Sequence, residues 1–85
     1  MVSPRKLLPT ILSARSDANI RFDDLRRLLS RLDFQERIKG DHHIFTRHGI
    51  VEIINLQPLP DGKAKPYQVK QVRQLVTQYR LEIDR

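Results

Sequence analysis

Residues 34–56, FQERIKGDHHIFTRHGIVEIINL, predict a three-stranded antiparallel sheet. Turn residues at Gly40-Asp41 and His48-Gly49 divide the stretch into runs at 34–39, 42–47 and 50–56. The last run is rich in β-branched residues, which suit a central or half-buried strand. Short turns of this kind join antiparallel neighbours, so the three runs are expected to pair side by side.

A helix is predicted on either side of this stretch. The segment 22–33 repeats apolar residues at helical spacing, at Phe22, Leu25, Leu28, Leu29 and Leu32. A loop at 57–65 carries prolines and Asp61-Gly62, and Pro66 then opens a second helix at about 67–81. We therefore predict an α+β domain of order α-β-β-β-α, with both helices on one face of the sheet.

The first nineteen residues form an N-terminal extension before a domain at 20–85. A short helical turn is expected after Ser3-Pro4, but Pro4 and Pro9 disfavour a regular amphipathic helix. We expect this extension to be partly disordered.

Composition narrows the classes of function. The chain has 85 residues, enough for one small domain, and its 16 Lys and Arg against 10 Asp and Glu give net charge +6. A basic balance favours a polyanionic partner, with nucleic acid as the first candidate. Cysteine is absent, which excludes a disulfide scaffold and a thiolate zinc site. No apolar run reaches the roughly 20 residues that span a bilayer, so we expect a cytoplasmic protein without a membrane partner.

Two adjacent histidines, His42 and His43, follow the first sheet turn. Neighbouring residues of a strand point to opposite faces, so the pair is not expected to hold one metal ion. Acid–base chemistry is the second interpretation, because an imidazole titrates near neutral pH and RNA cleavage needs a proton carrier beside cations. The third is that they are ordinary polar residues at a strand end. The residues alone leave catalysis and this plain role open.

Several cations are candidates for contact with RNA phosphates. Gly40 lets another backbone approach closely, and Lys39 and Arg47 belong to the strands around the histidines. A second group surrounds the start of the last helix, at Lys63, Lys65, Lys70 and Arg73. This placement is typical of folds that bind double-stranded RNA, so we predict phosphate contacts there.

The residues GDHHIF (40–45), a third strand, and Lys65-Pro66 opening a helix that continues VKQVR resemble the HicA family of bacterial type II toxins, the mRNA interferases. The resemblance covers about residues 22–81. It implies a double-stranded RNA-binding-domain topology and a metal-independent endoribonuclease that cleaves mRNA and inhibits translation. It implies no cofactor, and a HicB-type antitoxin as partner.

By position, His42 matches the histidine of the family's Gly-x-His motif, and Gly40 matches its glycine. His43 is the substitute, because family members differ in which histidine follows the glycine. Asp41 stands where a serine or glycine is more usual, which places a negative charge beside the site. A non-catalytic RNA-binding module of the same fold is the alternative function.

Overall fold

The computed structural model describes residues 1–83. In chain order its elements are α1 (Pro4–Ser13), the short 3-10 helix η1 (Asp17–Asn19), α2 (Phe22–Arg31), β1 (Gln35–Lys39), β2 (His42–Arg47), β3 (Ile50–Leu56) and α3 (Pro66–Tyr79). Within these residues the α-helices and strands follow the order α-α-β-β-β-α. The predicted α+β order is thus confirmed from residue 20 onward, and one further helix precedes it.

The three strands form one antiparallel sheet in the order β1-β2-β3. Lys39 pairs with His42 across the first turn, and Ile44 in the central strand lies between Arg37 and Asn55. Gly40 has a φ of +63°, a left-handed backbone angle that glycine adopts at little cost. The strands at 35–39, 42–47 and 50–56 agree with the predicted boundaries to within a residue.

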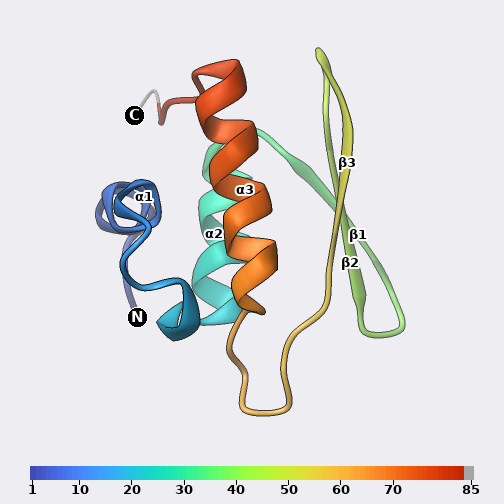
Figure 1. Cartoon of the computed structure of the whole chain (residues 1–85). Helices are drawn as coiled ribbons and strands as arrows, with labels where there is room; N and C mark the ends of the chain where they lie inside the picture. The colour runs from blue at the N-terminus through green and yellow to red at the C-terminus, as the bar shows by residue number, and fades with distance from the viewer. Residues whose placement is uncertain (84–85) are drawn as a thin grey trace.

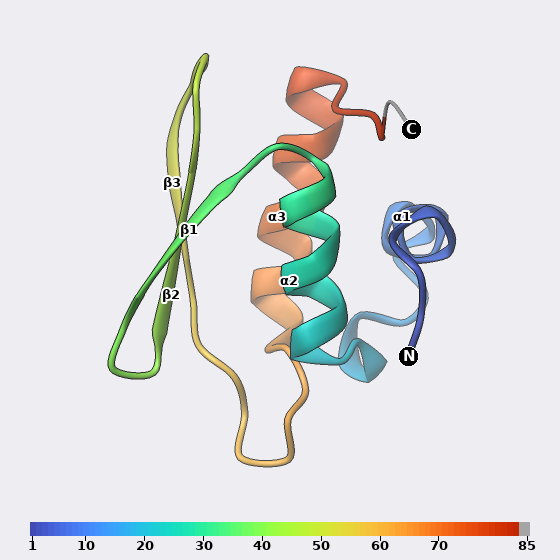
Figure 2. The same cartoon turned by 180° about the vertical axis from the view of Figure 1, so that it is seen from behind.

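Figures 1 and 2 show α2 and α3 side by side against one face of the sheet, with α1 on the far side of these helices. Phe45, Ile54 and Leu56 point from the sheet into the core and are buried. The leucines of α2 and of its C-cap and the valines of α3 meet them at helical spacing, at Leu25, Leu28, Leu29, Leu32, Val69, Val72 and Val76. The opposite face of the sheet is covered by no element of residues 1–83 (Figures 1 and 2).

The N-terminal residues have more order than their sequence predicts. Residues Pro4–Ser13 form α1, and Ser3 caps it by accepting a hydrogen bond from the Lys6 backbone N–H. Pro4 occupies the first helical turn, where its missing N–H costs nothing. Leu7 and Ile11, one turn apart, are buried in the main core. The prediction of partial disorder is therefore wrong for Pro4–Ser13. The burial of these two side chains outweighs the loss of the backbone hydrogen bond that Pro9 cannot donate.

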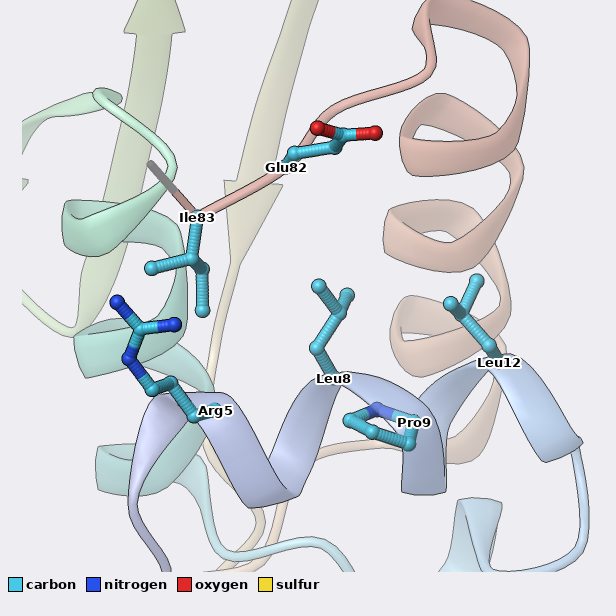
Figure 3. A pocket seen from close by; sticks show the side chains of 6 residues that line it. All are labelled: Arg5, Leu8, Pro9, Leu12, Glu82 and Ile83. Atoms are coloured by element: carbon cyan, nitrogen blue, oxygen red, sulfur yellow. The ribbon is translucent and has the colours of Figure 1, made fainter. Parts of the chain in front are cut away.

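Polar and apolar contacts attach the N-terminal segment to the rest of the chain. The Arg73 guanidinium of α3 donates to both carboxylate oxygens of Asp17, at 2.8 and 3.0 Å, and to the Ile11 carbonyl at 3.1 Å. On another side of α1, Leu8 and Leu12 line an open apolar groove with Ile83 of the C-terminal segment (Figure 3). The segment 1–19 thus packs against the rest of the domain and contributes Leu7 and Ile11 to its core.

Candidate active site

His42 is placed by the tight turn between β1 and β2. It is the first residue of β2, and its side chain points to the sheet face that carries no helix. About 51% of this side chain is exposed, so a bulky substrate can reach the imidazole. His43 follows it on the opposite face, as the alternation of a strand requires.

Two oxygen atoms lie beside the two ring nitrogens of His42. The Nδ1 atom is 3.2 Å from Oδ1 of Asn55 on β3, and Nε2 is 3.8 Å from Oδ1 of Asp41. An amide oxygen only accepts hydrogen bonds, so Nδ1 is the donor in this pair. The Nε2 atom is then free to take or give a proton, which is the arrangement that acid–base catalysis requires.

A hydrogen-bonded chain joins the turn to the start of α3. Gln57 donates to Oδ2 of Asp41 at 2.5 Å, and Lys65 Nζ donates to the Gln57 side-chain oxygen at 3.5 Å. The hydrogen bond from Gln57, aided by the positive charges of His42 and Lys65, lowers the pKa of Asp41. The carboxylate therefore stays ionised at neutral pH, and a lysine ammonium is held near it through Gln57.

His43 lies in a different environment. Its Nδ1 is 2.6 Å from Oε2 of Glu36, its ring meets the edge of Phe22 at 4.9 Å between centroids, and only 12% of its side chain is exposed. Arg26 of α2 donates to both oxygens of the same glutamate, at 2.7 and 3.2 Å. These contacts fasten β1 and β2 to α2, and they place the His43 side chain on the opposite face of the sheet from His42.

The pKa of Glu36 reflects this network. Partial burial raises it, but the hydrogen bonds and positive charges of Arg26 and His43 together outweigh burial, and the net pKa is below its usual value. Glu36 is therefore a carboxylate at neutral pH and orients the histidine through charge as well as geometry.

The predicted phosphate contacts divide into two groups. Lys39 is the cross-strand partner of His42, Gly40 forms the adjoining turn, and Lys65 reaches the turn through Gln57. These three join His42 at one site. Arg47 lies at the other end of β2, five residues away or about 16 Å along a strand, and does not reach it.

The remaining basic residues lie elsewhere. Lys63 is in the 57–65 loop, where its backbone forms an isolated antiparallel β-bridge with Arg21, the residue before α2. Lys70 is close enough to Asp17 to help lower the pKa of that carboxyl, after the larger effect of Arg73. Arg73 itself is occupied by Asp17, with only 17% of its side chain exposed. Of the four cations near the helix start, Arg73 is therefore already engaged within the fold.

Two residues of the site were missed from sequence, Asn55 and Gln57. A signal was present, since Asn55 is the single amide in the apolar run IVEIINL. An amide in such a strand is unusual, because it is depleted from strands and needs a hydrogen-bond partner. Only the pairing of β2 with β3 shows that this partner is His42.

No protein-family model, curated protein or solved structure matches the chain. Within the described part of the chain, no three His, Cys, Asp or Glu side chains gather in the way that a metal site requires. None of the helices in residues 1–83 has the length and apolar character to cross a membrane.

Proposed function

We propose that this protein is a metal-independent endoribonuclease that uses His42 as its general acid or base. One observation carries the proposal: an exposed imidazole has Nδ1 fixed by Asn55 and its Nε2 left for proton transfer. Lys39 is the cross-strand partner of His42, and Lys65 is joined to the same turn through Gln57 and Asp41; both cations suit the charge that develops on a phosphate during cleavage.

The chemistry needs no group beyond RNA, water and the chain. The 2′-oxygen of a ribose attacks the adjacent phosphorus while the bond to the 5′-oxygen of the next nucleotide breaks. His42 Nε2 takes the proton of the 2′-hydroxyl, or in its protonated form gives one to the departing 5′-oxygen, and water serves the other step. The products are a 2′,3′-cyclic phosphate and a free 5′-hydroxyl.

The biological role that we propose is that of a HicA-type toxin, which cleaves mRNA and inhibits translation in the cytoplasm. The resemblance of residues 40–45 and 65–73 to that family supports it. So does the order α2-β1-β2-β3-α3 with both helices on one face, which is the arrangement of double-stranded RNA-binding domains. A HicB-type antitoxin would neutralise the protein by covering His42.

A second function is favoured by one feature of the site. Asp41 is ionised and lies 3.8 Å from Nε2 of His42, where its negative charge opposes the approach of a phosphate. A protein that holds RNA without cutting it would tolerate this carboxylate better than a nuclease would. A non-catalytic RNA-binding module is therefore the alternative.

Cleavage of a labelled mRNA in EDTA distinguishes the two functions. We expect His42→Ala to lose about 10² to 10⁴ in rate, the usual contribution of one acid–base group. His48→Ala is the matched control, because this exposed histidine lies in the turn after β2, away from the site. Full activity of His42→Ala contradicts the assignment, and a wild type that binds RNA in EDTA without cutting it supports the binding module.

Loss of activity in His43→Ala could come from unfolding, because His43 contacts Glu36 and Phe22. The cleavage rate of this variant is therefore compared with that of wild type at a temperature where circular dichroism shows both fully folded. We expect a folded His43→Ala to keep most of its activity. If it is inactive while His42→Ala is active, His43 is the catalytic residue.

A further inference from the structure

The strands sort their charged residues between the two faces of the sheet. Both strand glutamates point toward the helices, where Glu36 is bound by Arg26 and His43, and Glu52 accepts a hydrogen bond from the Tyr79 hydroxyl. The other face, called the open face here, is formed by the side chains that point away from α2 and α3, among them Arg37, Lys39, His42, Ile44, Val51 and Ile53. No residue of β1, β2 or β3 contributes a carboxylate to this face.

Two exposed cations line the β1 side of the open face. Arg37 and Lys39 are two residues apart on one strand, so their side chains emerge on the same face about 6.6 Å apart. Neither side chain forms a hydrogen bond or an ion pair with any residue in 1–83. This spacing is close to that of neighbouring phosphates in an extended nucleic-acid strand.

The β3 side of the open face carries Asn55 beside His42 and two aliphatic residues farther along the strand. Val51 and Ile53 are 88% and 61% exposed, and Ile44 of the central strand, which pairs with Arg37 and Asn55, is the diagonal neighbour of Ile53. Exposed aliphatic residues grouped beside unpaired cations indicate a binding surface. A ligand that suits it has anionic groups along one edge and flat apolar groups along the other.

We infer that the open face binds single-stranded RNA and leads it to His42. The phosphates lie along Arg37 and Lys39, and the unpaired bases lie over Ile44 and Ile53. A duplex fits less well, because its bases are stacked inside and leave the aliphatic side chains without a partner. That the RNA leads to His42 rests on the proposed function. Because the open face includes His42 itself, RNA is a better candidate ligand than an acidic protein.

Binding is measured with fluorescent RNA whose 2′-hydroxyls are all methylated, because such RNA cannot be cleaved by attack of the 2′-oxygen. We expect Arg37→Gln to weaken binding about fivefold at 0.1 M salt, since one phosphate contact contributes a slope of about 0.7 in the logarithm of salt concentration. Arg15→Gln is the matched control, because it removes the same exposed charge in the segment between α1 and η1.

The apolar half of the face has its own matched pair. Ile53→Thr should weaken RNA binding, whereas Ile38→Thr should not, because Ile38 is also exposed but pairs with His43 and points to the other face. Single-stranded RNA should bind more tightly than a duplex of the same sequence. Equal binding by Arg37→Gln and Arg15→Gln, or tighter binding of the duplex, overturns the inference.

The outcomes separate this inference from the nuclease proposal. If the open-face variants lose RNA binding but wild type never cleaves unmodified RNA, the open face is correct and the nuclease is not. If wild type cleaves and the variants bind and cleave normally, the nuclease stands and the RNA path is wrong. Variants that keep RNA binding but escape a co-expressed antitoxin would identify the face as a protein interface and overturn the inference.

Discussion

Replacing Arg73 by methionine tests whether the N-terminal segment belongs to the folded domain. The change keeps most of the side-chain length but removes three donated hydrogen bonds, two to Asp17 and one to the Ile11 carbonyl. The side chains of Arg73 and Asp17 are 17% and 24% exposed, so the pair lies between a solvent-exposed and a fully buried ion pair. Exposed pairs contribute about 0.2 to 1 kcal/mol, and breaking buried ones costs about 3 to 5 kcal/mol.

We therefore expect Arg73→Met to lower the free energy of unfolding by about 2 kcal/mol. For a domain of this size that corresponds to a fall in Tm of roughly 8 to 16 °C, which differential scanning calorimetry resolves easily. Glu82→Gln is the control, because it removes one exposed charge near the C-terminus and should shift Tm little.

The pH dependence of stability gives an independent check that the Arg73–Asp17 ion pair causes the stabilisation. The hydrogen bond from Arg73 lowers the pKa of Asp17 below its ordinary value of 3.8 in the folded protein. The stabilisation is therefore complete above that value and disappears as pH falls through the lower folded pKa. The difference between wild type and Arg73→Met should shrink below about pH 4. A Tm loss under 2 °C at pH 7 would refute the reasoning, and so would a loss that stays constant down to pH 2.

Three further predictions concern the sheet. Ile54→Val should lower the unfolding free energy by about 1 kcal/mol in urea titration because Ile54 is fully buried, whereas Ile53→Val, on the exposed side, should change it little; equal effects would contradict the assigned faces. Gly40→Ala should cost about 1 kcal/mol through its φ of +63° alone, since no atom lies within 4 Å of the added Cβ, and an unchanged midpoint would rule out this turn geometry. Glu36→Gln should lower thermal stability by about 1 to 2 kcal/mol at pH 7, with the difference from wild type fading as pH falls below about 4.5, because the folded pKa of Glu36 is lowered; a difference that grows in acid would show the opposite sign.

Local patterns predicted the elements from residue 20 onward. The repeated leucines of α2 and the glycines at the two sheet turns are short-range signals, and the structure follows them closely. The helix α1 gave a weaker signal, because Leu7 and Ile11 are its only buried residues and Pro9 interrupts it. Arg73 of α3 donates to the Ile11 carbonyl of α1 across 62 residues of sequence, and no local pattern contains such a contact.

The candidate site was predictable only in part for the same reason. His42, Gly40 and Lys39 are consecutive or nearly so, and a turn brings them together. Asn55 and Gln57 reach His42 and Asp41 through strand pairing and the path of the loop that follows. Lys70 and Arg73 looked like free cations on the helix surface, but the N-terminal segment lies against that surface and takes up Arg73.

The strand β1 has a further consequence for the behaviour of the protein in concentrated solution. It is an edge of the sheet, all five of its residues are exposed, and its free backbone groups could pair with the same strand of another molecule. Arg37 and Lys39 oppose that pairing, because two molecules would bring like charges together along the strand. Neutralising these cations by substitution removes this electrostatic barrier to strand pairing. Preparations of Arg37→Gln should therefore aggregate sooner than wild type when they are concentrated at low salt.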